Sequence, residues 1–170
     1  MKKEYTAYIL RRSPAAREIL DSREFQDLAA FPRHLNMTNT RDHSIRVAVL
    51  MARFAERNGL DPDSAIKTAL LHDMCYVNYY RKNDHPGLYC FYHPEEAADN
   101  AGLSFGLTEE EDRAIRAHMF PLALHVPSGK LALSLTLSDK AVSIYEGLYG
   151  VRPLRSAMRS VARRILPVLR

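Results

Sequence analysis

The sequence predicts an all-α fold: a single compact bundle of about six to eight helices over residues 1–170. Apolar residues recur at helical spacing along most of the chain, and no convincing run alternates apolar and polar residues as a strand would. Hydrophobic residues make up 46% of the 170 positions, enough for one buried core. We expect this core domain at about 39–148, with a helix from each end of the chain packed on it.

Start and stop signals divide the chain into expected elements. Asn58-Gly59 ends one strong helix, and Asp61-Pro62 offers the N-cap and first-turn proline of the next. Thr108 and Glu111 have the spacing of a capping box. The expected helices are 14–30 (weak), 42–57, 61–75, a short one opened by His93-Pro94 and ending near 101, 108–119, 129–148 and 154–166. Loops are expected at 31–40, 76–92 and 120–128.

The bulk composition restricts the partners. A net charge of +4 and a pI of about 9.1 suit a small anionic ligand. Lys and Arg are scattered and not clustered, so no nucleic-acid partner is expected. No stretch reaches the ~18 apolar residues of a membrane helix, so no membrane partner is expected either. Cys75 and Cys90 form no CxxC motif, and a reduced, cytoplasmic setting fits them best. A homodimer is left open.

Asp139 lies inside the most apolar of the expected helices. One and two turns before it stand Leu135 and Leu131, and Val142 follows one turn later. An unpaired carboxylate on that face would cost several kcal/mol of desolvation. A divalent cation would neutralise it, and a buried Arg or Lys is the structural alternative.

Histidines occupy similarly apolar surroundings. His72 and Asp73 are adjacent after an apolar run, and His43 lies in the first strong helix. With Asp139 they could bind one ion, and His93 and His118 would extend the set to hold two ions with Asp73 as a bridge. Imidazole and carboxylate together suit Fe, Mn, Zn, Ni or Co better than Ca or Mg.

Each histidine also has a plain structural interpretation. A buried histidine is often bonded only to a backbone carbonyl. His93 could be a loop residue before a proline, and His118 could be a helix-terminal residue favoured by the dipole. The ordered set on separate helices favours the metal site.

A metal site of this kind makes hydrolysis of phosphate esters feasible. Bound metal lowers the pKa of water from 15.7 towards ~7 and polarises a phosphoryl oxygen. With two ions, Asp73 would be catalytic as the bridge. Lys140 and Arg46 are then candidates for stabilising developing charge, and Arg116 for binding the substrate.

Further candidates for substrate binding lie in the expected loops. His34 could reach the site and donate a hydrogen bond to a phosphate group of the substrate, or it could lie on the surface. Five tyrosines in 76–92, among them Tyr76 and Tyr80, could form a lid on which a nucleobase stacks. Packing of these tyrosines against the helical body is the equal alternative.

The order His43, His72-Asp73, His93, His118, Asp139 resembles the signature of the HD-domain superfamily of metal-dependent phosphohydrolases, over roughly 39–146. The segments HPEEAADNAG, IRAHMFPLALHVP and LSDKAVSIYE are similar to those of small bacterial HD hydrolases. This resemblance implies that His43, His72, Asp73 and Asp139 are metal ligands and that His93 and His118 complete a second metal position. It also implies hydrolysis of a phosphomonoester or diester, of a nucleotide or a related compound.

The sequence departs from the cyclic-dinucleotide branch of that superfamily. Met74-Cys75-Tyr76 stands where that branch has Ile-Gly-Lys after the HD pair, and the Gly-Tyr-Pro tripeptide is absent. Two other functions stay open on the same ligand order. One is a non-catalytic nucleotide-binding module, and the other is a dinuclear-iron oxygenase such as the inositol oxygenase that HD proteins resemble.

Overall fold

The computed structural model describes residues 2–33, 38–78 and 87–149. Within these ranges the regular secondary structure is helical apart from one two-stranded antiparallel pairing, so the all-α prediction is confirmed. The elements in chain order are α1 (Lys2–Leu10), α2 (Ala16–Asp21), α3 (Arg23–Asp27), the 3₁₀ turn η1 (Leu28–Ala30), β1 (Pro32–Arg33), β2 (Thr38–Asn39), α4 (Thr40–Asn58), α5 (Pro62–Leu71), α6 (Tyr89–Phe105), α7 (Glu109–Ala117) and α8 (Gly129–Tyr149). The helix expected at 154–166 lies outside the described residues, and the single-domain assignment of 1–170 stays a prediction.

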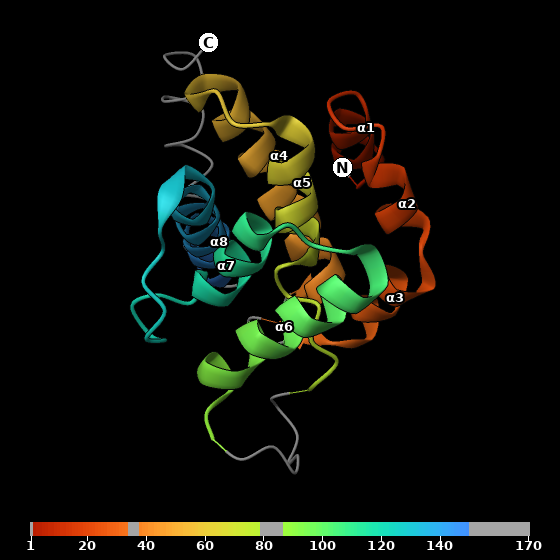
Figure 1. Ribbon diagram of the computed structural model, residues 1–170. Coiled ribbons are helices and arrows are strands. Elements are labelled where there is room, and N and C mark those ends of the chain that lie inside the picture. The colour runs from red at the N-terminus through yellow and green to blue at the C-terminus, as the bar shows by residue number, and fades with distance from the viewer. Residues whose placement is uncertain (1, 34–37, 79–86, 150–170) are drawn as a thin grey trace.

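Helices α4 and α5 form the middle of the fold. They pack against each other, with α7 and α8 on one side and α1 to α3 on the other, while α6 crosses below them (Figure 1). Segments distant in sequence, such as α4 and α8, are therefore neighbours.

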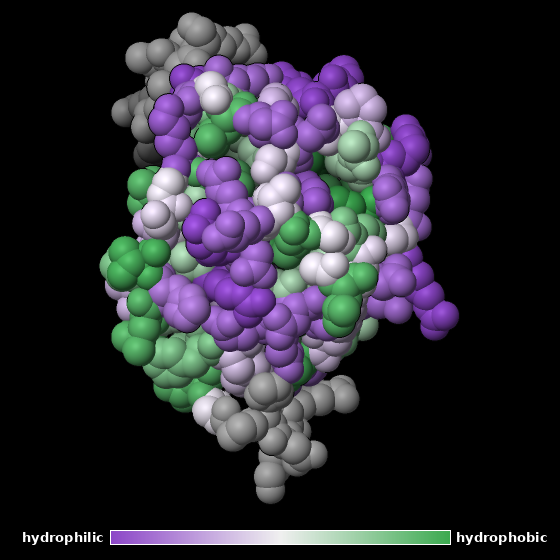
Figure 2. Space-filling model, viewed as in Figure 1, coloured by the Kyte–Doolittle hydropathy of each residue, from purple (hydrophilic) through white to green (hydrophobic). Residues whose placement is uncertain are grey.

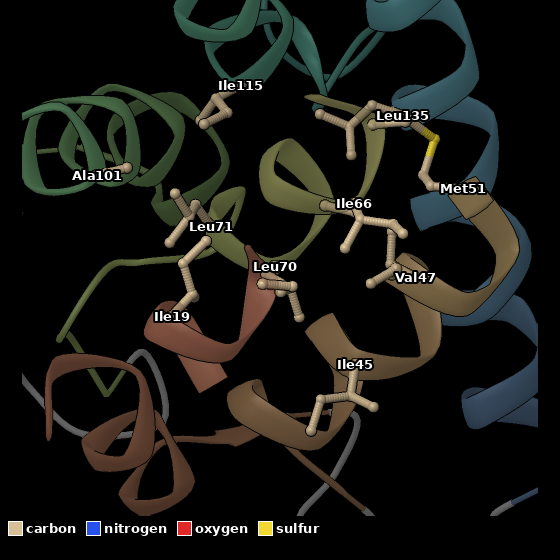
Figure 3. Packing of buried hydrophobic residues seen from close by; sticks show 14 of the residues in the cluster. Ile19, Ile45, Val47, Met51, Ile66, Leu70, Leu71, Ala101, Ile115 and Leu135 are labelled. Carbon is tan, nitrogen blue, oxygen red and sulfur yellow. The ribbon is translucent and has the colours of Figure 1, made fainter. Parts of the chain in front are cut away.

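The two central helices have well-defined ends. The Asn39 side chain accepts a hydrogen bond from the backbone N–H of Asp42 and caps α4, whose C-terminal Gly59 adopts a left-handed conformation with φ of 65°. The Asp61 side chain caps α5 ahead of Pro62. Figure 3 shows apolar side chains from α4, α5 and α8 directed toward one another in the shared core, among them Val47, Met51, Ile66 and Leu135.

The N-terminal part differs from the prediction. The expected helix 14–30 is broken into α2, α3 and η1, because Ser22 takes an extended conformation (φ −68°, ψ 149°) and caps α3 with its hydroxyl. Helix α1 was not predicted from the sequence. In the expected loop 31–40, Pro32 and Arg33 pair with Asn39 and Thr38.

Helix α6 begins earlier than predicted. His93-Pro94 was interpreted as a first-turn signal, yet α6 starts at Tyr89 and runs to Phe105 with Pro94 inside it. Proline lacks the N–H that would bond one turn back, but only that one bond is lost. The observed ends of α5 and α7 are likewise Leu71 and Ala117, a few residues before the expected ones.

The surface shown in Figure 2 is hydrophilic over its middle, with a hydrophobic group at the left edge, where the α7–α8 loop lies. Leu122, Leu124 and Val126 of that loop are exposed. Among the described helices, none has both the length and the apolar character needed to span a membrane.

Candidate metal centre

Six side chains from five helical segments meet in the interior. His43, His72, Asp73, His93 and His118 are at most 1% exposed, and Asp139 is 7% exposed. His43 belongs to α4, His93 to α6 and Asp139 to α8, while His72 and Asp73 directly follow α5 and His118 directly follows α7. The predicted convergence of distant polar residues is therefore what the structure shows.

The six residues are arranged around Asp73. Ligand atoms of His43, His72 and Asp73 lie within 4.8 Å of one another, and so do those of Asp73, His93 and His118. Asp139 joins the first group, because its Oδ1 lies 3.0 Å from His43 Nε2 and 3.7 Å from His72 Nε2. Asp73 belongs to both groups, which is the position of a bridging carboxylate.

Three of the four imidazoles are oriented by their own helices. The Nδ1 of His72 donates to the carbonyl of Ala69 at 2.8 Å, and that of His118 to Ile115 at 2.7 Å. His93 Nδ1 donates to the carbonyl of Tyr89 at 2.8 Å in the same way. A carbonyl oxygen can only accept, so each Nδ1 carries a proton and each Nε2 faces the cluster, where it can bind an ion once any proton on Nε2 has left. The three histidines therefore bond to backbone carbonyls through Nδ1, as the structural alternative expects, and can still bind a metal through Nε2.

His43 is held by a carboxylate instead. Its Nδ1 lies 2.8 Å from Oε2 of Glu146, whose Oε1 accepts from Arg46 Nη1 at 2.5 Å. Glu146 is buried, and the sequence interpretation missed it. A signal was present, because Glu146 follows Asp139 by seven residues and so falls on the same face of α8. A carboxylate behind a metal-binding histidine fixes its tautomer and raises its basicity.

The donor set fits a divalent transition metal. His72 Nε2 is buried without a hydrogen bond, and an unmade bond at a buried polar atom is costly. Asp73 Oδ1 makes no hydrogen bond either, but it forms an ion pair with Arg33 Nη2 at 2.6 Å. His93 Nε2 and His118 Nε2 face each other at 3.0 Å although both Nδ1 protons are already donated elsewhere. Coordination by a cation would satisfy all four atoms, so these residues suit one ion in each group.

The pKa values show how much positive charge the site requires. Burial lowers the pKa of His72, but Asp73 and Asp139 outweigh it and raise that pKa to about 10. Burial would raise the pKa of Asp73, yet Arg33 and His72 hold it well below its usual value. Burial together with the charges of His72 and His93 lowers the pKa of His118 to about 3. In the absence of metal, protons and Arg33 therefore supply the charge that ions would bring.

Metal affinity is expected to rise with pH. A pKa of about 10 keeps His72 protonated at neutral pH, and the metal has to displace that proton. The affinity should increase by about tenfold per pH unit for each proton displaced between pH 6 and 9. Competition with a chromophoric chelator at several pH values, corrected for the chelator's own protonation, measures this slope. An affinity independent of pH would contradict the assignment of His72 as a ligand.

The predicted basic residues lie at different distances from the cluster. Lys140 donates from Nζ to the carbonyl of His118 at 2.9 Å, and burial lowers its pKa. Arg46 contacts the cluster through Glu146. Arg116 instead pairs with three carboxylates, Glu95, Asp99 and Asp112.

The predicted loop residues divide similarly. The Tyr76 hydroxyl donates to the backbone carbonyl of Glu24, and its ring packs edge-on against Phe31. This contact corresponds to the packing alternative for the tyrosines. His34 and Tyr80 lie outside the described residues. The substrate-binding roles of Arg116, Tyr76, His34 and Tyr80 stay predictions.

Arg33 is a second residue that the sequence interpretation missed. Its Nη2 lies 2.6 Å from Asp73 Oδ1, and its Nε donates to Thr40 Oγ1 at 3.3 Å. Its guanidinium also lies 5.3 Å from the ring centre of Tyr89, which stacks on His93. No sequence pattern indicates this contact, since it depends on how the segment of β1 folds back onto the cluster.

Helix α6 is anchored beside the His72-Asp73 pair. The Cys75 thiol donates to Glu96 Oε2 at 2.8 Å, and the Asn100 side chain donates to the carbonyl of Met74 at 2.8 Å. Burial raises the pKa of the Cys75 thiol, so it stays protonated and keeps this bond. The two contacts fix the position of His93 relative to Asp73.

Comparison with known proteins agrees with this geometry. A protein-family model described as the HD domain matches residues 40–147, which include all six clustered residues. No curated protein and no solved structure matches the chain. The family match covers more than half of the chain, and the buried His and Asp cluster is compatible with the metal site of that family. The chain therefore belongs to the HD-domain superfamily, whose members are generally metal-dependent hydrolases.

Proposed function

We propose that this protein hydrolyses a phosphate monoester or diester, of a nucleotide or a related compound, with two divalent transition-metal ions. The observation that carries the proposal is the position of Asp73 in both ligand groups. Two ions held by these groups would supply an activated water and a hold on the phosphoryl group. Fe, Mn, Zn, Ni and Co are the ions that this donor set favours.

The chain's own residues supply orientation and charge. His43, His72, Asp73 and Asp139 would hold one ion, and Asp73, His93 and His118 the other. Bound ions would supply a nucleophilic water at neutral pH and a Lewis acid for the phosphoryl oxygen. Lys140, whose Nζ donates to the His118 carbonyl beside the second group, would stabilise charge on a phosphate oxygen. Arg46 acts through Glu146 by holding the carboxylate that orients His43.

Arg33 has a role in substrate binding under this proposal. It neutralises Asp73 Oδ1, the oxygen that an ion would take. The Arg33 guanidinium lies beside the proposed ion positions, and its planar fork suits a phosphate oxygen bound there.

Replacing Arg33 with methionine is therefore expected to raise KM by about 10- to 100-fold, the usual contribution of a charge-assisted hydrogen bond. Metal content should change little, because Arg33 is no ligand. Steady-state kinetics and metal analysis of the same preparation measure both effects. Arg41→Met is the matched control, since Arg41 contacts Gln26 and Asp42 instead of the cluster. An unchanged KM would remove Arg33 from the substrate site.

A turnover screen tests the proposed activity. Metal-free protein is reloaded separately with each of the five favoured ions and assayed for release of nitrophenol from mono- and bis-nitrophenyl phosphate, and of phosphate from nucleotides. Metal-dependent turnover under anaerobic conditions supports hydrolysis by water. Binding of nucleotides without turnover for any ion would favour the binding module. Turnover only with iron and oxygen would favour the oxygenase.

A further inference from the structure

We propose that a groove between α1, α4 and α8 is a second ligand site, for a small aromatic anion, coupled to the metal centre through Arg46 and Glu146. The groove has a volume of about 320 Å³, near the lower end of the ~300–1,000 Å³ typical of small-molecule sites. It lies behind His43, on the side of the ring opposite the cluster, because its Arg46 reaches the Glu146 carboxylate that contacts His43 Nδ1.

The residues lining the groove combine three kinds of side chain. Aliphatic residues from α4 and α8 provide an apolar surface, tyrosines from α1 and α8 provide aromatic rings, and α4 adds two arginines. The main contributors are Val49, Val142, Tyr5, Tyr145, Arg46 and Arg53. A mostly apolar pocket with a few convergent polar groups is the usual composition of a small-molecule site.

The charge of the groove selects an anion. Arg46 and Arg53 are seven residues apart on one face of α4, about 10 Å along the helix axis. No carboxylate is among the described residues that line the groove. The hydrogen bonds of Arg46 to described residues all leave from Nη1, so Nε and Nη2 remain for a ligand. Arg53 lies 5.7 Å from the ring centre of Tyr8 and is exposed to solvent.

The size and the tyrosines select an aromatic body. Tyr5 and Tyr145 offer rings against which a planar group can stack, and Val49 and Val142 gain from its burial. Inorganic phosphate would use the arginines alone and leave the apolar surface wet. An aromatic carboxylate or phosphate of one or two rings satisfies both parts of the groove.

A chain of short contacts connects the groove to the cluster. Arg46 Nη1 lies 2.5 Å from Glu146 Oε1, Glu146 Oε2 lies 2.8 Å from His43 Nδ1, and His43 Nε2 lies 3.0 Å from Asp139. An anion at Nε and Nη2 of Arg46 shares the charge of the guanidinium with Glu146, which is bonded by Nη1, so it changes the hold of Glu146 on His43. Linkage then requires that metal and anion alter each other's affinity by the same factor.

Titration with 2-naphthoate tests the site without any assay of activity. Binding is followed calorimetrically in metal-free and in zinc-loaded protein. We expect saturable binding, a Kd that differs at least about threefold between the two forms, and weaker binding of the uncharged 2-naphthalenemethanol. Failure of the hydrolase assay would leave these expectations unchanged, because the metal-free protein also carries the groove.

Variants distinguish the groove from direct coordination of naphthoate to zinc. Arg53→Met should weaken naphthoate binding by about tenfold or more, while the matched Arg57→Met, outside the groove, should not. Ala141→Phe, at an exposed groove position, should block binding by filling the space. Wild-type affinity in both groove variants, or equal Kd values with and without zinc, would overturn the proposal.

Discussion

Substitution of Asp73 by alanine is expected to remove both metal ions together and to lower turnover on the order of 10³-fold or more. The carboxylate belongs to both ligand groups, so its loss leaves neither group complete. Metals contribute several kcal/mol to transition-state stabilisation, and each 1.36 kcal/mol is a factor of ten in rate. Metal analysis by mass spectrometry and a phosphatase assay on the same protein measure the two effects.

The control for this variant is Glu111→Gln. Glu111 is also a buried carboxylate, but it closes the capping box of α7 and pairs with Lys67, away from the cluster. Its replacement should lower the thermal midpoint modestly and leave the metal content intact. If Asp73→Ala retained a full complement of metal, the bridging assignment would be wrong.

Glu146→Gln is expected to lower metal affinity by about 10- to 100-fold, the range for partners that orient metal-binding histidines. Glutamine can still accept a hydrogen bond from His43 Nδ1, but it carries no charge to raise the basicity of the imidazole or to hold Arg46. Chelator competition on the folded variant measures the change.

Arg46→Met gives a graded comparison for Glu146. It removes the ion pair and leaves the Glu146–His43 contact in place, so its effect on metal affinity should be smaller. If the Glu146→Gln variant bound metal as tightly as the wild type, the carboxylate would have only a structural role.

Sequence patterns predicted the long elements and singled out the six residues that the structure brings together, for a common physical reason. Helix α4 has strong helical periodicity, α8 is a long and mostly apolar segment, and α7 has a capping box whose two hydrogen bonds are both present. The clustered histidines and aspartates could be found because a polar residue in an apolar helix needs a partner. Each such residue was visible without knowledge of the fold.

The missed features depend on tertiary contacts or on local alternatives of similar energy. The break at Ser22 uses a serine that can either continue a helix or cap the next one. Arg33 contacts a residue forty positions away, and nothing near it in the sequence indicates this. Glu146 could have been found by extending the face of Asp139 for two turns. The start of α6 was predicted wrongly from His93-Pro94, because the sequence does not distinguish a proline inside a helix from one in its first turn.

The origin of the ligands in five different helical segments has a mechanical consequence. Three imidazoles receive their orientation within their own helix, so only the approach of the helices remains to be fixed when the ions enter. Ions held there would cross-link the segments of α4, α5, α6, α7 and α8 at a single point. Removal of the ions by a chelator should therefore lower the stability of the whole helical bundle and not of one helix alone, because ligand binding stabilises every contact that its site requires.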